Sequence, residues 1–493
     1  MWQDFIARHA QERADHVALV DRQNRQSHTY AQLEAEILRL AAHLAALGVQ
    51  EGDRVALLAP SRMEHVTLFF ACVRLGAILA PLNHRLAPQE IDAILDELDP
   101  VLKLGDDQTP GFRPLSILEG PPPALTLPPP VAIPDHRVMM ILYTSGSSGR
   151  PKGVMLHAAM ILANIHNTIS ADVLRAEDIS IVNTPFFHTG GYHVFCLPML
   201  SIGGTLILHP RFDPGLVLEE IRQAGVTVFW AVPTMFQAMF DHPDFQQTDF
   251  SRIRFFLSGG APLSLALIQG YHQKGVPFKQ GFGLTEVGPN CFLLETADAW
   301  NHPDSIGRPM TRSTVQVMDE NGAPVAVGQV GEMWIAGPHV CLGYWRNDAL
   351  FATAMRDGSF ATGDLVRMDA EGFYYVIGRK KEMYISGGEN VYPGEVEKQL
   401  TTHPAVVQAV VVGVADEKWG EVGLAFCVVR APVTLEALRA HLNTRLARYK
   451  HPHHLRILSG FPLLANGKID RPALKQQGRD TILSERGGTA DPV

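Results

Sequence analysis

The chain has 493 residues, of which 46% are hydrophobic and 19% are charged, and 42 basic against 51 acidic residues give a formal charge of −9. This composition is typical of a globular protein and excludes disorder as the main state. The length predicts two to four folding units. The acidic balance argues against nucleic acid or an anionic membrane as a general partner, although it allows local basic patches.

The cysteines are an odd number, lie far apart and include no C-x-x-C pair: they are Cys72, Cys196, Cys291, Cys341 and Cys427. This spacing argues against a disulfide framework or a zinc site and predicts buried free thiols in a reducing cytoplasm. The first turns, MWQDFIARHAQERAD, are polar and charged, so we expect no signal peptide. Residues 184–210 contain no Asp, Glu, Lys or Arg but include histidines, glycines and prolines, and they predict core strands and loops without a membrane span.

Helix and strand patterns alternate along the first hundred residues. Apolar spacing predicts helices over residues 5–15, 30–48 and 64–76, and short apolar runs that end in proline predict strands over 53–60 and 76–83. Such a βαβ rhythm indicates a parallel sheet covered by helices. The proline-rich residues 119–135 predict a semi-rigid surface connector within one body.

Further apolar strands are predicted over residues 138–144, 205–210, 227–233 and 254–260, and turn-bounded segments at 320–325 and 369–376 predict a small antiparallel unit. After Arg379 the pattern changes to an α+β set of about a hundred residues. We therefore expect an α/β fold with two domains. Residues 1–379 would form a large body of parallel and mixed sheets with a small β-barrel-like subdomain, and residues 380–493 a small lid.

The strongest chemical motif is YTSGSSGRPKGV, residues 143–154, which follows an apolar strand and precedes a stretch that we expect to be helical. Glycines let backbone N–H groups approach an anion, and hydroxyls and a lysine add donors and positive charge. The residues concerned are Thr144, Ser145, Gly146, Ser147, Ser148, Gly149, Lys152 and Gly153. The motif differs from a Walker A loop because Lys152 stands between proline and glycine. It predicts a phosphate-binding loop.

This segment resembles the phosphate-binding signature of the adenylate-forming superfamily, which includes acyl-CoA synthetases, the adenylation domains of peptide synthetases and firefly luciferase. Four further segments match that family in order and spacing: QGFGLTEVG (280–288), ATGD (361–364), GRKKEMYISGGENVYPGEVE (378–397) and LLANGKIDR (463–471). The resemblance runs nearly end to end. It is greatest to fatty-acyl and hydroxycinnamoyl CoA ligases.

The resemblance implies an ATP and AMP site. Glu286 would supply an oxygen ligand for Mg2+ shared with the ATP phosphates. Asp364 would accept hydrogen bonds from the ribose hydroxyls, and Arg379 would contact the ribose. Phe282 would cover one face of the adenine, with FLSGGAPL (256–263) on the other. The implied set is Thr144, Ser145, Gly146, Ser147, Ser148, Gly149, Lys152, Gly260, Ala261, Pro262, Gln280, Gly281, Phe282, Gly283, Thr285, Glu286, Asp364, Arg379 and Lys468.

Lys468 would neutralise the charge that develops as a substrate carboxylate attacks the α-phosphorus. The implied catalytic set also contains Thr144, Lys152, Glu286 and His188. His188 is expected to be a pocket wall because a carboxylate is already ionised at pH 7 and needs no general base. Lys381 matches the family's hinge, about which the lid would rotate.

Two further sets complete the resemblance. The coenzyme A set is Arg85, Gly387, Gly388, Trp419, Lys450, His451 and His453. The acyl-pocket set is Phe187, His188, Gly190, Gly191, Tyr192, Trp230, Thr234, Gly260 and Gly283. We expect the paired glycines to leave room for the acyl group. No lysine or arginine in the sequence obviously awaits a second carboxylate, which disfavours dicarboxylic acids.

The resemblance implies an ATP-dependent carboxylic acid:CoA ligase that forms an acyl-AMP and pyrophosphate, then acyl-CoA and AMP. Its substrate would be a fatty acid or an aryl-propenoic acid such as ferulate or coumarate. The expected ligands are the acid, ATP, Mg2+ and coenzyme A, with no nucleic acid, and a homodimer stays open. Two alternatives also stay open: an adenylating enzyme that loads a carrier protein, and a non-catalytic nucleotide-binding protein.

Overall fold

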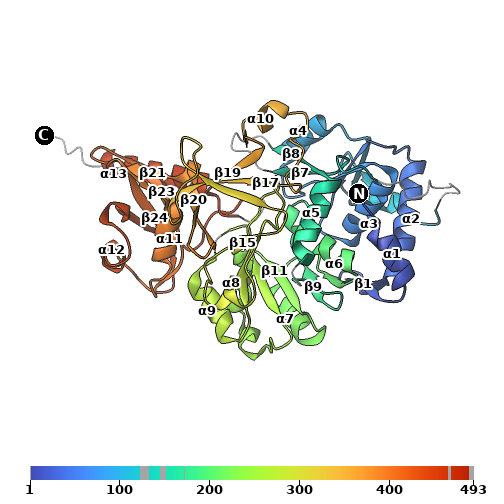
Figure 1. Cartoon of the computed structure of the whole chain (residues 1–493), viewed down its shortest axis with the longest axis horizontal. Helices are drawn as coiled ribbons and strands as arrows, with labels where there is room; N and C mark the ends of the chain where they lie inside the picture. Colours follow the sequence, from blue (N-terminus) through green and yellow to red (C-terminus); the bar gives the residue numbers. More distant parts are fainter. Residues whose placement is uncertain are drawn as a thin grey trace. The chain divides into compact units, whose positions relative to one another are not determined.

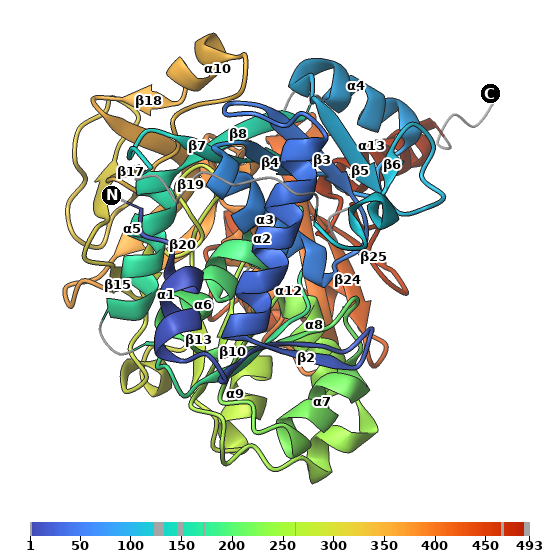
Figure 2. The same cartoon turned by 90° about the vertical axis from the view of Figure 1, so that its right-hand side faces the viewer.

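The computed structural model describes residues 2–122, 133–144, 151–170, 173–261, 263–464 and 468–487, with side chains as far as residue 480 (Figures 1 and 2). The chain divides into two compact units. The first consists of Met1–Ala261, Tyr271–Val315 and Ile335–Ala361, and the second of Pro262–Gly270, Gln316–Trp334 and Thr362–Val493. Within the described ranges, no helix combines the length and the apolar character needed to cross a bilayer.

The largest sheet of the first unit has the order β6-β5-β3-β4-β7-β8, and all neighbours are parallel except the antiparallel pair β7 and β8. Its strands are β3 (Arg54–Leu58), β4 (Ile78–Pro81), β5 (Leu102–Gly105), β6 (Arg113–Pro114), β7 (Val138–Thr144) and β8 (Lys152–His157). Alternate residues face opposite sides, because Val55 and Leu57 belong to one hydrophobic cluster and Ala56 and Leu58 to another.

Helices cover both faces of this sheet. On one face the cluster contains residues of α1 (Phe5–Glu12), α2 (Tyr30–Ala46), α3 (Met63–Leu75) and α5 (Ala158–Ile169). On the other face it contains residues of α4 (Pro88–Leu98). The chain therefore builds the helix-covered parallel sheet that the βαβ rhythm predicts.

Two smaller sheets belong to the same unit. One has the order β2-β1-β10-β9 and consists of β1 (Val17–Asp21), β2 (Gln26–Thr29), β9 (Ile179–Val182) and β10 (Thr205–Leu208). The other is parallel with the order β11-β12-β13 and consists of β11 (Val228–Ala231), β12 (Phe255–Ser258) and β13 (Phe278–Gln280). The ends of parallel strands are common positions for ligand-binding loops.

The remaining elements of this part of the chain are short. They are η1 (Leu115–Leu118), η3 (Gly190–Val194), α6 (Cys196–Ile202), α7 (Pro214–Gln223), α8 (Pro233–Phe240), η4 (Pro243–Gln247), α9 (Leu265–Gln273), η5 (Asp298–Trp300) and α10 (Asp348–Ala352), with the strand pair β14 (Phe292–Leu293) and β15 (Arg308–Pro309).

A five-stranded sheet has the order β16-β17-β19-β18, with β20 paired to β19. Its strands are β16 (Thr314–Met318), β17 (Val330–Ala336), β18 (Met355–Arg356), β19 (Ser359–Met368) and β20 (Tyr374–Arg379). The pairs of β19 with β18 and with β20 are antiparallel. This sheet contains the small antiparallel unit that the turn-bounded segments predict.

The second unit ends in an α+β layer with the sheet order β22-β21-β24-β23 and β25 beside β24. Its elements are η6 (Lys380–Glu382), β21 (Tyr384–Ser386), β22 (Glu389–Val391), α11 (Pro393–Leu400), β23 (Val406–Asp416), β24 (Gly420–Val429), α12 (Leu435–Leu442), η7 (Arg448–Lys450), β25 (His454–Ile457) and α13 (Arg471–Gly487). One hydrophobic cluster joins α11 and α12 to this sheet, and a separate cluster joins α13 to it (Figure 1).

The α/β fold class is confirmed, and the helices and strands predicted for the first hundred residues form near their predicted bounds. One local prediction is wrong. The stretch after the phosphate loop is strand β8, which pairs with β7 over its whole length, and helix α5 begins only at Ala158. Long-range pairing with β7 decides this segment, because its own apolar residues fit either period. The boundary at residue 379 stays a prediction.

Candidate active site

The two residues that flank the predicted phosphate loop lie side by side. Thr144 is the last residue of β7, Lys152 is the first of β8, and the two are paired across the hairpin. A Cβ on Gly153 would lie 3.0 Å from Cγ2 of Ile141, so close packing beneath the hairpin favours glycine there. The intervening predicted ligands, Ser145, Gly146, Ser147, Ser148 and Gly149, lie outside the described residues.

Glu286, Tyr344 and Lys152 come together in the first unit. The hydroxyl of Tyr344 donates a hydrogen bond to Oε1 of Glu286 at 3.0 Å. The Nζ atom of Lys152 lies 5.0 Å from the centroid of the Tyr344 ring, which is within cation–π range. A β-bridge between Val154 and Tyr344 fixes this arrangement. The structure therefore brings a carboxylate and an ammonium of the predicted site to one buried aromatic ring.

Tyr344 was missed by the sequence reasoning, because nothing in its local sequence marks it as a partner of a glutamate 58 residues away. Burial is the main cause that raises the pKa of Tyr344 far above its usual value, and the charge of Glu286 adds to the effect. The hydroxyl therefore stays protonated and stays a donor to Glu286.

The carboxylate of Glu286 is the kind of oxygen ligand that Mg2+ takes in proteins. Within the described ranges, no cluster of three or more His, Cys, Asp or Glu residues could hold a metal ion. Magnesium is commonly bound through one or two carboxylates together with substrate phosphates and water. Glu286 would hold the ion through its carboxylate, and the bound ion would neutralise phosphate charge.

Backbone atoms dominate the loops after β12 and β13. Gly260 has φ +83°, a left-handed backbone conformation that favours glycine. The space beside it is open, because an added Cβ would have Cγ1 of Val232, 3.9 Å away, as its nearest neighbour. Gly281 donates its N–H to the carbonyl of Ser258 at 2.7 Å. Ala261 directly follows Gly260, and Pro262 lies outside the described residues. An adenine could lie against such side-chain-poor backbone.

The predicted adenine-covering segment is tightly packed. The ring of Phe282 meets the ring of Phe292 edge-on, with centroids 5.8 Å apart. A Cβ on Gly283 would lie 2.3 Å from the carbonyl oxygen of Gly288, so glycine is required there by packing. The side chain of Gln280 donates to the carbonyl of Pro303 at 2.9 Å. Thr285, next to Glu286, is half-buried.

Asp364 and Arg379 form a pair in the second unit. They are aligned partners on β19 and β20, and Nε of Arg379 lies 2.7 Å from Oδ1 of Asp364. The Asp364 side chain is only 4% exposed, whereas that of Arg379 is 38% exposed. Within the described part of the chain, Oδ2 of Asp364 is buried without a hydrogen-bond partner. A buried acceptor of this kind is costly unless a ligand hydroxyl satisfies it.

The electrostatic surroundings of Asp364 join it to two further predicted residues. Burial is the main cause that raises the pKa of Asp364 to about 6. The positive charge of Arg379 opposes this effect, and Lys468 and Lys381 oppose it as well. The structure thus brings the predicted ribose-binding pair, the catalytic lysine and the hinge lysine within reach of one another's charge. Lys381 lies in η6, directly after β20.

The predicted acyl pocket has less free space at its glycines than the sequence suggested. A Cβ on Gly190 would lie 2.6 Å from Cζ2 of Trp230, whose Nε1 donates to the carbonyl of Gly190 at 3.0 Å. A Cβ on Gly191 would lie 2.6 Å from the carbonyl oxygen of Pro185. The expectation that the paired glycines leave room is wrong, because Trp230 and backbone fill the space.

The other acyl-pocket residues divide between core and wall. Tyr192 is fully buried, and its hydroxyl donates to the carbonyl of His65 at 2.9 Å, so it belongs to the core. Phe187 contacts the ring of its neighbour His188 with centroids 4.7 Å apart. Thr234 is exposed in the first turn of α8.

The predicted coenzyme A residues also divide. Arg85 is exposed, and its guanidinium lies 5.9 Å from the centroid of the Phe187 ring. Gly387 and Gly388 have φ +60° and +87° and form the two-residue turn between β21 and β22. Such a turn requires left-handed backbone at both positions. A Cβ on Gly387 would lie 2.7 Å from Cε3 of Trp419, which is 41% exposed.

The cations at 450–453 are less available than their sequence suggests. The Nζ atom of Lys450 lies 2.7 Å from Oε2 of Glu395. His451 is buried, and its Nε2 donates to the carbonyl of Leu446 at 3.1 Å. Burial is the main cause that lowers the pKa of His453, which keeps this half-buried imidazole neutral at pH 7. A role of these residues with a phosphate stays a prediction.

Comparison with known proteins identifies the family. The model of the family described as "AMP-binding enzyme" matches residues 6–345, and that of the "AMP-binding enzyme C-terminal domain" matches residues 395–468. A feruloyl-CoA synthase of Amycolatopsis sp. is 39% identical over 451 residues, which are 90% of this chain and 92% of that protein. A long-chain-fatty-acid–CoA ligase of Mycobacterium tuberculosis is 34% identical over 473 residues, 92% of this chain and 94% of the relative.

A solved structure agrees with these relatives. The o-succinylbenzoate CoA synthetase of Bacillus subtilis, in complex with its acyl-adenylate intermediate, superposes with a TM-score of 0.86 at 29% identity and covers 96% of this chain and 98% of its own. The chain therefore belongs to the AMP-binding enzymes of the adenylate-forming superfamily, and within them it is an acid–thiol ligase.

Proposed function

We propose that this ligase joins a carboxylic acid to coenzyme A through an acyl-adenylate, with MgATP as the nucleotide substrate. The observation that carries the proposal is the meeting of Glu286, Tyr344 and Lys152 at the base of the phosphate hairpin. A fixed ammonium and a fixed carboxylate beside a glycine-rich loop suit a polyphosphate and its magnesium ion.

In the first step, an oxygen of the substrate carboxylate attacks the α-phosphorus of ATP, and pyrophosphate leaves. We assign Lys468 to the negative charge that develops at the α-phosphate, and Lys152 and Thr144 to the leaving phosphates. Asp364 would accept from a ribose hydroxyl through its buried Oδ2, and Arg379 would hold that carboxylate in place. Fixed charges aimed at a developing charge are worth about 3–4 kcal/mol each.

In the second step, the sulfur of coenzyme A attacks the acyl carbon, AMP leaves, and the thiol proton passes to water. The cation at Lys468 serves the first step and is not needed in the second. We propose that residues 380–493 act as a mobile lid that rotates about Lys381 between the two steps. Arg85, Trp419 and the turn at Gly387 and Gly388 are the proposed contacts of coenzyme A.

The acid that we propose is an aryl-propenoic acid or a fatty acid. Relatives named for ferulate and for long-chain fatty acids match this chain over at least nine-tenths of its length. The aromatic wall of Phe187 and Trp230 suits both classes, since each presents apolar surface beyond its carboxylate.

The five cysteines are free and buried, which supports the cytoplasm as the compartment.

Exchange of labelled pyrophosphate into ATP tests the adenylation step directly. A panel of acids should contain at least one aryl-propenoic or fatty acid that drives exchange without coenzyme A, and Lys468→Ala should abolish that exchange. A protein that binds ATP but shows no exchange with any acid would instead be a non-catalytic nucleotide-binding protein. Thioester formation on an added carrier protein, with none on coenzyme A, would instead make it a carrier-loading enzyme.

A further inference from the structure

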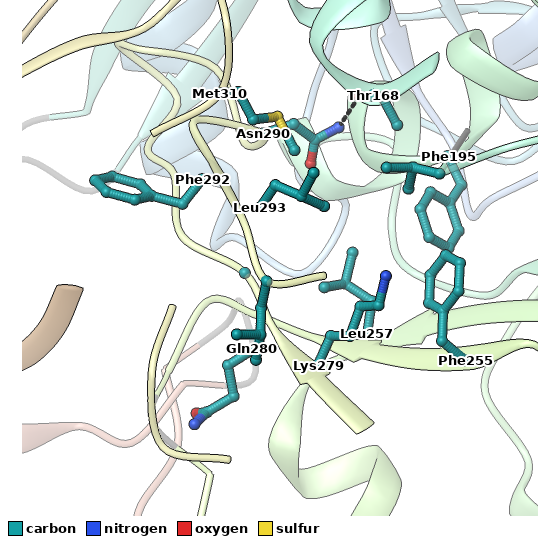
Figure 3. Close-up of a pocket in the computed structure, with 13 residues that line it drawn as sticks. Thr168, Phe195, Phe255, Leu257, Lys279, Gln280, Asn290, Phe292, Leu293 and Met310 are labelled. Carbon is teal, nitrogen blue, oxygen red and sulfur yellow. Dashed lines mark hydrogen bonds between the residues drawn. The ribbon is translucent and has the colours of Figure 1, made fainter. Parts of the chain in front are cut away.

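A small cavity lies on one face of the three-stranded sheet of the first unit (Figure 3). Its lining includes Phe195, Phe255, Leu257, Lys279, Asn290 and Phe292. Its volume of about 20 Å3 is enough for about one water-sized group. None of these six residues belongs to the predicted acyl pocket, and the lining also includes Gln280 and Gly281 of the predicted nucleotide-binding set.

Lys279 is the unusual member of this lining. It is only 4% exposed, and Figure 3 shows its ammonium pointing into the cavity beside Phe255. Its Nζ atom lies 4.1 Å from the centroid of the Phe255 ring, which is within cation–π range. A buried ammonium carries three donors, and leaving them unsatisfied is costly.

The charge on Lys279 survives at neutral pH despite this burial. Burial is the main cause that lowers the pKa of Lys279 to about 8, and the positive charge of Arg254 lowers it further. The negative charge of Glu295 acts in the opposite direction. The side chain is therefore mostly a cationic donor near pH 7, and it faces an apolar space.

The sheet register connects this cavity with the predicted acyl wall. Trp230 on β11 is aligned with Leu257 on β12, and Leu257 is aligned with Lys279 on β13. Aligned residues of neighbouring parallel strands share a face, so these three side chains form one row. Two strand spacings separate Trp230 from Lys279, which is about 10 Å. An acyl group that passes Trp230 would thus have its far end near the ammonium.

Three chemical groups at the end of the acyl group remote from the reacting carboxylate can be compared as partners of Lys279. A saturated alkyl tail offers no hydrogen-bond acceptor to the ammonium. A second carboxylate needs more than one water-sized space, must itself be desolvated, and would meet the negative charge of Glu295. A hydroxyl on an aromatic ring places one oxygen in the cavity and lets the ring pack against Phe255 and Leu257.

We propose that Lys279 is a specificity-determining residue that donates a hydrogen bond to a ring hydroxyl at the far end of an aryl acid. This inference rests on the proposed ligase function and narrows its substrate class to hydroxyaryl acids. Sites built to bind a substrate hydroxyl reject the analogue that lacks it, because their own polar group is then left unpaired.

The test compares 4-hydroxycinnamic acid, cinnamic acid and octanoic acid as substrates of the full-length enzyme. For the wild type, kcat/KM for the hydroxylated acid should exceed that for cinnamic acid by at least about 100-fold. In Lys279→Met this ratio should fall to about tenfold or less, through a higher KM for the hydroxylated acid, while cinnamic acid is used as well as before or better.

The matched control is Lys274→Met, a half-exposed lysine whose Nζ donates to the carbonyl of Gln246 on the surface. It should keep the wild-type ratio. A wild-type ratio near one would overturn the inference, even if Lys279→Met failed to fold. An equal loss for all acids in Lys279→Met would also overturn it, because it would indicate a purely structural lysine. If no acid is activated at all, the proposed function itself fails.

Discussion

Nε of Arg379 lies 2.7 Å from Oδ1 of Asp364, while Oδ2 of the same buried carboxylate has no hydrogen-bond partner among the described residues. The arginine thus holds one oxygen and leaves the other as an acceptor. An ionised carboxylate can accept from ligand hydroxyls, whereas a protonated one loses part of this capacity and its attraction to Arg379.

Nucleotide binding should therefore weaken in mild acid. Burial raises the pKa of Asp364 to about 6, so the ionised form is lost as the pH falls through about 6. Below that pH the population of carboxylate falls about tenfold per unit. We expect the affinity for AMP, measured by calorimetry from pH 8 to 5, to follow this curve. Asp364→Asn should bind weakly with a flat profile, and a flat wild-type profile would contradict the assignment.

The raised pKa of Asp364 also makes the stability of the fold depend on pH. Because the pKa of Asp364 is raised in the folded state, this group stabilises the fold at low pH and loses that contribution as the pH rises through about 6. Near neutral pH the buried, ionised Asp364 therefore lowers the stability of the ligand-free protein, and such a loss of stability is common at binding sites.

Glu286→Gln should lower the adenylation rate by about 100-fold and raise the Mg2+ concentration needed for half-maximal rate. The amide keeps the shape of the side chain and an acceptor for Tyr344 but removes the charge that favours a cation. Tyr344→Phe is the matched control, since it removes only the hydrogen bond and should leave the Mg2+ requirement nearly unchanged. An unchanged Mg2+ requirement in Glu286→Gln would rule out its role toward the ion.

Lys468→Ala should separate the two half-reactions. Loss of the cation at the α-phosphate should slow formation of the adenylate by at least about 100-fold. Conversion of supplied acyl-AMP to acyl-CoA should stay within about threefold of the wild type. Single-turnover kinetics of each half-reaction make the comparison, and an equal loss in both would remove Lys468 from the first step.

The paired glycines should respond differently to one added methyl group. Gly190→Ala meets a side chain, Trp230, which can shift, so its main effect should be a changed order of preferred acids. Gly191→Ala meets the backbone of Pro185 and should cost about 1–3 kcal/mol of stability. Thermal unfolding and kcat/KM over an acid panel distinguish these outcomes. Equal destabilisation by both changes would show that Trp230 cannot move.

Local sequence patterns predict many of the helices and strands, because the conformation of these elements depends mainly on residues near them in the chain. The strand at β3 and the helix at α3 are marked by their own apolar runs and by flanking glycine and proline. Strand β8 was missed because its partner β7, not its own sequence, determines its conformation.

The site residues also fall into those that sequence motifs mark and those that only folding brings into place. Asp364 and Arg379 were found from motifs, and the structure joins them in one ion pair. Tyr344 and Lys279 were missed because their roles depend on residues brought close by folding. The lysine in PFKQGFG stands directly before the predicted adenine-covering segment 280–288, and this neighbourhood was a usable signal for it.

A product analysis of the complete reaction tests whether this enzyme joins an acid to coenzyme A through an acyl-adenylate. The enzyme is incubated with ATP, Mg2+, coenzyme A and 4-hydroxycinnamic acid, and nucleotides and thioesters are separated by chromatography with mass detection. We expect acyl-CoA and AMP in equal amounts, with pyrophosphate as the other product and an acyl-AMP that accumulates when coenzyme A is omitted. Formation of ADP and phosphate in place of AMP, or release of AMP without any thioester, would contradict this expectation.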